Sequence, residues 1–221
     1  MPECEVEISG ERLTLLADKA VWWAARKTLF IADVHLGKIE TFQRYAISLP
    51  SGSTGHDLQR LTQLIDATRA ERLVVLGDWL HAKSAQTPFV HQQIQQWRDA
   101  HANLQLLLVQ GNHDRHAGDV PSAWRIDSAD EGHQDAPFIY AHYPQEHEGG
   151  YVFAGHLHPA VQLRGYGKQI IKQACFWVRP RYMVLPAFGS FTGTALLQTE
   201  PSDKIFVLVS ASVLPLRKYD S

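Results

Sequence analysis

The stretch Thr28-Leu29-Phe30-Ile31-Ala32-Asp33-Val34-His35 sets the pattern from which the fold is predicted. Its apolar run reads as a buried strand, and Asp33 and His35 follow directly after it. The runs 72–76, 104–109, 138–140 and 151–154 have the same form. The polar groups that follow them are Gly77-Asp78, Gly111-Asn112-His113-Asp114, His142 and Gly155-His156-Leu157-His158. Because sites in α/β sheets lie at the carboxyl ends of strands, these groups are expected to converge.

Two segments between these runs have apolar residues at helical spacing. The first starts at Thr54 with a sequence that resembles a capping box, and the second follows Thr87-Pro88, an N-cap residue with proline at the first helical position. Their apolar stripes are Leu58, Leu61, Leu64 and Ile65, and Val90, Ile94 and Trp97. Residues 28–109 therefore alternate strand and helix, as in an α/β fold.

Strands are expected on both sides of this alternating region. Residues 6–16 read as two strands joined by a tight turn at Ser9-Gly10, and residues 20–24 pair with residues 28–32. Beyond about residue 120 the helical spacing fades, and short strand-like runs continue to Leu216. The predicted fold class is α/β, with a two-layer β-sandwich flanked by helices.

Length and composition favour one domain that spans residues 1–221. A chain of 221 residues with 45% hydrophobic content can bury a full core. No linker rich in Pro, Gly or Ser divides it, and a boundary between residues 33 and 158 would split the polar groups described above.

The net charge of −2 and the pI of about 6.6 argue against a protein that coats nucleic acid by bulk electrostatics. Between Gly149 and Thr199, however, the chain has no Asp or Glu. The basic residues of this acid-free stretch are Arg164, Lys168, Lys172, Arg179 and Arg181, and its aromatic residues include Tyr166, Phe176, Trp177 and Tyr182. One interpretation is a nucleic-acid patch in which Arg179 and Arg181 contact substrate. The other is a strand edge protected by charge, with Phe176 or Trp177 in the core.

The two cysteines, Cys4 and Cys175, are far apart and lack the spacing of a metal site, which fits a reducing compartment. The first residues lack the layout of a signal peptide, and no apolar run approaches the roughly 20 residues that span a bilayer. We therefore expect a cytoplasmic protein without membrane association.

Taken in order, the polar groups resemble those of the calcineurin-like metallophosphoesterases, which share the two-layer sandwich fold. The resemblance implies two divalent ions, which such hydrolases hold roughly 3.5–4 Å apart. It assigns Asp33, His35 and His158 to one ion, Asn112, His142 and His156 to the other, and Asp78 to both. His133 and His147 compete for the place of His142, but neither follows so apolar a strand.

Chemistry supports this ligand set. In Asp33-x-His35, as in the later His-x-His group, a chain leaving a strand would point the i and i+2 side chains the same way. With so few carboxylates the centre would stay positive even when a hydroxide bridges the ions, and it would attract a phosphate anion. The ions would also lower the pKa of the bridging water toward neutrality, which supplies a nucleophile.

His113 follows a ligand but is not counted as one, because the histidine of Gly-Asn-His-(Asp/Glu) faces the substrate in the resembled family. Its expected role is to protonate the leaving oxygen or to stabilise the transition state, with Asp114 orienting it and raising its pKa. Arg115 and His81 are candidate substrate contacts, and His81 reads equally well as an ordinary exposed histidine.

A narrower resemblance covers nearly the whole chain and points to the bacterial ligase-associated DNA-damage-response endonucleases. It rests on Trp22-Trp23, residues 33–38, 77–81, 111–116 and 155–159, Cys175-Phe176-Trp177 and residues 185–189. It implies a Mn²⁺-dependent phosphodiesterase acting on DNA and grouped with an ATP-dependent DNA ligase, a helicase and an exonuclease. Ligand chemistry alone would also accept iron, zinc, cobalt or nickel.

Two other functions stay open at this point. A phosphodiesterase or phosphatase for nucleotides would use the same metal site, and it fits the overall negative charge better. A non-catalytic scaffold of the same fold would have no need of His113. The oligomeric state is also open, because Trp22 and Trp23 could form a homo-oligomer interface or fill the core.

Overall fold

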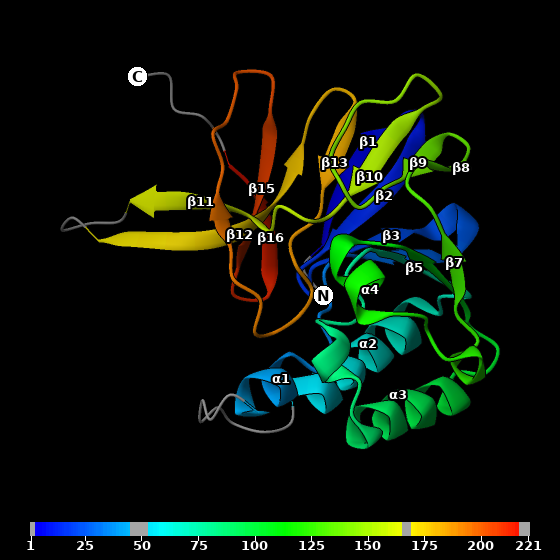
Figure 1. Cartoon of the computed structure of the whole chain (residues 1–221). Coiled ribbons are helices and arrows are strands. Elements are labelled where there is room, and N and C mark those ends of the chain that lie inside the picture. The colour runs from blue at the N-terminus through cyan, green and yellow to red at the C-terminus, as the bar shows by residue number, and fades with distance from the viewer. Residues whose placement is uncertain (1–2, 45–52, 165–168, 217–221) are drawn as a thin grey trace.

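The computed structural model describes residues 3–44, 53–164 and 169–216, so Tyr166 and Lys168 of the acid-free stretch lie outside the described residues. Within those ranges the chain forms two stacked β-sheets, and α2 and α3 cover the outer face of the first sheet (Figure 1). The fold is therefore the mixed α/β sandwich that the sequence predicts.

The first sheet follows chain order. Its strands are β1 (Glu3–Ile8), β2 (Glu11–Leu16), β3 (Ala20–Trp23), β4 (Thr28–Ile31), β5 (Arg72–Leu76), β6 (Gln105–Val109) and β7 (Asp127–Ala129). The strands from β1 to β4 pair in antiparallel fashion, and those from β4 to β7 pair in parallel. The hairpin at Ser9-Gly10 and the pairing of β3 with β4 are confirmed.

The second sheet is assembled from the later strands. Along its path these are β14 (Ala195–Leu196), β11 (Pro159–Arg164), β12 (Ile170–Val178), β13 (Tyr182–Val184), β10 (Tyr151–Ala154), β9 (Phe138–Tyr140) and β8 (His133–Asp135). β15 (Lys204–Val209) pairs with β12, and β16 (Ser212–Pro215) pairs with β15. β9, β10 and β13 run parallel, and β11 and β12 form a hairpin that projects from the body (Figure 1).

The predicted helices are present as α2 (Ser53–Thr68) and α3 (Pro88–Ala100). Thr87 caps α3, since its hydroxyl accepts a hydrogen bond from the backbone N–H of Val90 at 3.2 Å. The other helical segments are α1 (Lys38–Arg44), α4 (Asn112–Ala117), η1 (Ala24–Arg26), η2 (Lys83–Ala85) and η3 (Ser122–Trp124). No helix in the described ranges is both long and apolar enough to cross a membrane.

Alternation along the central strands separates two apolar cores. Leu29 and Ile31 of β4 pack with Leu61 of α2 and Ile94 of α3, whereas Phe30 between them faces the second sheet. Successive side chains of a strand point to opposite faces, so each central strand contributes to both cores. The core between the sheets also holds Trp23, which is fully buried and therefore fills the core, as one of the two interpretations proposed.

The parallel strands of both sheets end at one place. Asp33, Asp78 and Asn112 follow β4, β5 and β6, while His142 and His156 follow β9 and β10. The segment after β13 joins the two sheets there, because its backbone N–H groups at Phe188 and Gly189 donate to the carbonyls of Ala32 and Asp33. The polar groups of the sequence are thus collected between two sheet edges.

Candidate metal centre

The first predicted ligand group is brought together by β4 and the turn after β10. One ligand atom from each of Asp33, His35 and His158 lies within 4.8 Å of the others. The Nε2 atom of His158 is 3.6 Å from an Asp33 carboxylate oxygen, and Nε2 of His35 is 3.6 Å from an oxygen of Asp78. These spacings leave room for an ion between the groups but are too long for direct hydrogen bonds.

Both of these imidazole atoms lack a protein partner. Nε2 of His35 and Nε2 of His158 are buried, and neither has a hydrogen-bond partner within the part of the chain that the structure describes. An unsatisfied buried polar atom costs roughly 1–3 kcal/mol. A cation at this place would satisfy both lone pairs, so the residues fit a bound metal ion.

The second group centres on His142, which is fully buried after β9. Its Nε2 atom lies 3.0 Å from the amide oxygen of Asn112, 3.1 Å from Nδ1 of His156 and 3.6 Å from a carboxylate oxygen of Asp78. Its Nδ1 atom lies 3.1 Å from the carbonyl of Leu76, an acceptor that requires a proton on Nδ1. The lone pair on Nε2 therefore points toward the other candidate ligand atoms. In metal sites the second imidazole nitrogen of a histidine ligand is commonly hydrogen-bonded to the backbone in this way.

Two glycines permit this convergence. A Cβ atom on Gly77 would lie 2.0 Å from Nδ1 of His142, and one on Gly111 would lie 2.3 Å from a carboxylate oxygen of Asp78. Gly77 also has a φ of +84°, a conformation open to glycine. The glycines that precede the polar residues in the sequence therefore make space for side chains that arrive from the other strands.

Several candidate ligands have left-handed backbones. The φ angles are +53° at Asp33, +51° at His35, +55° at Asp78, +69° at His156 and +48° at His158. The expectation that Asp33-x-His35 and His156-x-His158 keep strand geometry as the chain leaves its strand is therefore corrected, since the backbone turns at each of these four residues. Residues held in this region store roughly 1–3 kcal/mol each, and such strain concentrates at functional sites.

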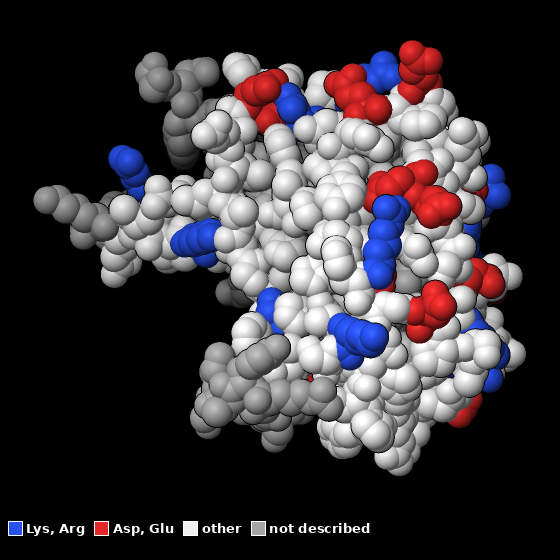
Figure 2. All heavy atoms as spheres, viewed as in Figure 1, with Lys and Arg blue, Asp and Glu red and all other residues white. Residues whose placement is uncertain are grey.

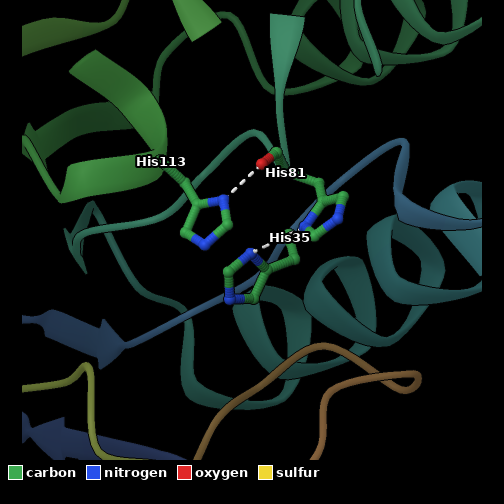
Figure 3. A group of neighbouring side chains, drawn as sticks. All are labelled: His35, His81 and His113. Atoms are coloured by element: carbon green, nitrogen blue, oxygen red, sulfur yellow. Dashed lines mark hydrogen bonds between the residues drawn. The ribbon is translucent and has the colours of Figure 1, made fainter. Parts of the chain in front are cut away.

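His35, His81 and His113 form a histidine cluster beside these ligands (Figure 3). The rings of His81 and His113 stack with centroids 5.1 Å apart, and Nδ1 of His81 lies 3.4 Å from Nδ1 of His35. Nδ1 of His113 is bonded to the backbone carbonyl of His81, and the backbone N–H of His113 donates to Asp78 at 2.9 Å. The structure thus brings both His81 and His113 to the predicted ligands.

Burial controls the charge of this histidine cluster. Burial, reinforced by His113 and Lys38, lowers the pKa of His35 to about 2. Burial, together with Lys38 and His113, also lowers the pKa of His81 to about 4. Both rings are therefore neutral at pH 7, and the neutral form is the one that binds metal ions. Burial raises the pKa of Asp78, which favours placing a cation beside its carboxylate.

Asp114 does not orient His113 in this arrangement. Its buried carboxylate accepts hydrogen bonds from the backbone N–H groups of Asp78, Trp79, Leu80 and Gly111, at 2.7–3.2 Å. As the third residue of α4, Asp114 points back toward the start of that helix, where these amides gather. Asp114 therefore fixes the loop that carries Asp78. The group that orients His113 is the backbone carbonyl of His81, in the role predicted for Asp114.

The proposed arginine contacts are not brought to this centre. Both arginines precede β13. Arg179 bonds to Asp203 and Glu200, and Arg181 bonds to the carbonyl of His147. The carbonyl of Arg181 accepts from Val152 near the start of β10, whereas the ligands follow the end of β10. Arg115, in contrast, is exposed and lies three residues after Asn112, on the same side of α4.

The acid-free stretch is therefore divided by the fold. Arg164 and Lys172 lie on the projecting β11–β12 hairpin, which begins directly after His158. Arg164 and Gln162 share a face with Lys172, because Gln162 and Lys172 pair directly. The visible surface of the hairpin shows basic but no acidic groups, whereas both signs mix on the rest of this face (Figure 2).

Sequence reasoning missed two residues that touch the ligands. Glu131 accepts the backbone N–H of His142, at 2.9 Å to its nearer oxygen. Tyr143 places its ring against His156, with centroids 4.5 Å apart. Glu131 follows no recognisable motif, but Tyr143 stands directly after a candidate ligand, and that position was an available signal.

Comparison with solved structures finds a strong match to a nuclease. The crystal structure of Pseudomonas putida nuclease MPE is similar to this chain with a TM-score of 0.85 and 37% sequence identity, covering 97% of this chain and 100% of that one. A phosphoesterase from E. coli, Yfce, aligns with a TM-score of 0.41 and 12% identity over 84% of this chain and 95% of that one. No protein-family model and no curated protein matches the chain.

The strong match agrees with the geometry. Identity of 37% extends over almost the full length of both chains. Buried Asp and His side chains that could hold metal ions gather at the ends of parallel strands. The chain therefore belongs to the calcineurin-like metallophosphoesterases, hydrolases of phosphoester bonds, and to the same family as the Pseudomonas putida nuclease.

Proposed function

We propose that the protein is a phosphodiesterase that cleaves DNA as an endonuclease, with two divalent ions in one centre. The observation that carries the proposal is the meeting of both ligand groups at Asp78, whose carboxylate is 3.6 Å from Nε2 of His35 and 3.6 Å from Nε2 of His142. A shared carboxylate between two sets of imidazole donors is the arrangement that a two-ion hydrolase requires.

Each ion would have its own ligands. Asp33, His35 and His158 would hold one ion, Asn112, His142 and His156 the other, and Asp78 both. When bound, the pair would supply a hydroxide nucleophile and stabilise charge on the phosphoryl oxygens. Mn²⁺ is the proposed metal, and the donor set also suits iron, zinc, cobalt or nickel.

His113 would act on the leaving oxygen. Its Nδ1 atom is bonded to the carbonyl of His81, so Nδ1 carries a proton and Nε2 is the atom left to serve the substrate. The same carbonyl fixes the orientation of the ring. His113 can therefore hold a proton at Nε2 and deliver it as the phosphoester bond breaks.

DNA as the substrate is supported by the similar Pseudomonas protein, which is named a nuclease, and by the basic hairpin beside the site. The proposal includes a cytoplasmic role in DNA repair, in association with an ATP-dependent DNA ligase, a helicase and an exonuclease. This part rests on the motif resemblance given above.

The experiment offers the Mn²⁺-loaded protein four substrates: supercoiled plasmid, single-stranded oligonucleotide, an aryl phosphodiester and the matching monoester. We expect nicking of plasmid or cutting of the oligonucleotide, with loss of activity in Asp78→Ala and His113→Ala. The exposed variant Lys204→Gln, on β15, is the control and should retain full activity.

Other results would replace the proposal. Cleavage of the aryl diester without action on DNA would indicate a small-substrate phosphodiesterase. Preference for the monoester would indicate a phosphatase. Metal-loaded protein that cleaves none of the substrates would indicate a non-catalytic scaffold.

A further inference from the structure

Tyr143 is an exposed aromatic residue in direct contact with the candidate ligands. Tyr143 is 39% exposed, whereas the neighbouring residue His142 is fully buried. The Tyr143 ring meets that of His156 at a centroid distance of 4.5 Å and an interplanar angle of 62°, and that of His142 at 5.0 Å and 71°. The tyrosine therefore borders the second ligand group on its solvent side.

The backbone just before Tyr143 is fixed by hydrogen bonds at Ala141 and His142. The N–H of Ala141 donates to the carbonyl of Phe153, the N–H of His142 donates to Glu131, and the carbonyl of His142 accepts from Gly155. Pro144, which follows, restricts the chain further. The ring is thus held at the rim of the site by structure that also holds the ligand.

Nothing else in the described ranges uses the polar end of this ring. The Tyr143 hydroxyl has no hydrogen bond to any described residue, whereas those of Tyr140 and Tyr151 bond to Asp135 and to the carbonyl of Arg179. A large apolar ring that stays exposed beside a site that attracts phosphate is suited to contact the substrate itself. Nucleobases stack on such rings regardless of sequence.

We propose that Tyr143 contributes to substrate binding by stacking on the nucleobase next to the phosphate that is cleaved. This inference rests on the proposed nuclease function and adds a contact beyond the phosphate. The ring touches His156 and His142, so a base on Tyr143 would belong to a nucleotide adjoining the phosphate at the second ligand group. Stacking of one base changes affinity by roughly 5- to 150-fold.

A double-mutant cycle on the metal-loaded protein tests this contact. The substrates are two oligonucleotides with one cleavable linkage, one with normal bases and one with abasic sites on both sides of that linkage. The enzymes are wild type, Tyr143→Ala and Tyr143→Phe. Phe89→Ala is the matched control, since Phe89 is 57% exposed in the first turn of α3 and contacts none of the ligands in the described structure.

We expect Tyr143→Ala to raise KM on the normal substrate by roughly 5- to 150-fold and to have little effect on the abasic one. Tyr143→Phe keeps the ring and should behave as wild type, as should Phe89→Ala. Metal content should be unchanged in each variant.

Equal losses on both substrates, or loss of metal from Tyr143→Ala, would overturn the inference and make Tyr143 a support for His156. No effect on either substrate, or a Tyr143→Phe variant as impaired as Tyr143→Ala, would also overturn it. A wild-type enzyme that cuts neither oligonucleotide would overturn the proposed nuclease function, and the inference would fail with it.

Discussion

At the residue scale, we propose that His113 and the candidate ligands that surround it have separable tasks. The Nε2 atoms of His35, His142 and His158 lie near oxygen atoms of other candidate ligands. His113, in contrast, is oriented by a backbone carbonyl. A residue that delivers a proton matters most when the leaving group is a poor one. The leaving group is therefore the variable that distinguishes a proton donor from a metal ligand.

We expect His113→Gln to lower kcat/KM on an oligonucleotide by roughly 10²- to 10⁴-fold, because an alkoxide leaving group needs a proton. On an aryl diester with an acidic phenol the loss should be much smaller. Measured metal content should equal that of wild type. A loss of the same size on both substrates would contradict the assignment of His113 as a proton donor.

Gly77 offers a second test at this scale. Gly77→Ala places a methyl group 2.0 Å from Nδ1 of His142, whereas Gly10→Ala, at a similar φ of +82°, meets nothing within 4 Å. In both variants, alanine in the left-handed conformation lowers the free energy of unfolding by about 1–2 kcal/mol. Gly77→Ala should lose roughly 1–3 kcal/mol more and most of its bound metal.

Urea unfolding and metal analysis of the two glycine variants give the comparison. The excess over Gly10→Ala isolates the contact with His142 from backbone strain. If both variants unfold at the same denaturant concentration and bind metal equally, the close packing around His142 does not hold the site together.

The convergence of the ligands could be predicted from the sequence because each one follows an apolar run that becomes a strand. Their turned backbones could not be predicted, since Asp33 and His158 take left-handed φ angles that no neighbouring glycine signals. The partners of Asp114 were also missed. They are amides supplied by the separate loop at residues 78–80, a tertiary contact without a local sequence signal.

At the element scale, an ionic contact between Arg72 and Asp135 joins the two sheets. Arg72 starts β5 of the first sheet and bonds to Asp135 of β8 in the second, and the Tyr140 hydroxyl donates to the same carboxylate at 2.9 Å. Burial alone would raise the pKa of Asp135, but the bonds from Arg72 and Tyr140 exceed that effect and lower it. Asp135 is thus stabilised in its charged form.

Because the folded-state pKa of Asp135 lies below the unfolded value of about 3.9, its charged form stabilises the fold at pH values above 3.9. This stabilisation is lost as the pH falls through the folded-state pKa. We expect Asp135→Asn to lower the free energy of unfolding by roughly 1–3 kcal/mol at pH 7. The difference from wild type should shrink as the pH falls below about 4. Denaturant unfolding at several pH values measures it, and a difference independent of pH would contradict the assignment.

Helix prediction succeeded where the apolar stripe was long. α2 and α3 were found by spacing, but α1 (Lys38–Arg44) and α4 (Asn112–Ala117) are too short for periodicity to be distinguished from a turn. The acid-free stretch was misleading for a different reason. A strand pair folds the chain back, so Arg164 and Lys172 come together while Arg179 lies at the far end of β12.

At the scale of the whole molecule, the candidate centre takes ligands from both sheets. We propose that residues 1–221 form one domain, because separating the sheets would divide Asp33 and Asp78 from His142 and His156. Metal binding would then stabilise the complete fold and not one layer of it.

Removal of metal should therefore lower Tm in a single transition. An ion present at a hundred times its Kd adds about 2.7 kcal/mol, which corresponds to roughly 5–10 °C for a chain of this length. Calorimetry of chelator-treated protein, before and after return of Mn²⁺, measures the shift. Asp78→Asn should show little response, and an equal response in that variant would place the stabilising ion elsewhere.

The left-handed angles at the candidate ligands also restrict how the ion preference could be redesigned. Asp, Asn and His are the non-glycine residues that tolerate this conformation best, and Asp and His are the types present at these positions. Exchanging Asp33 or His158 for cysteine or glutamate would oppose the backbone as well as the coordination chemistry. Engineers seeking a different metal would do better to alter the residues that surround these positions, and to leave the ligand identities as they are.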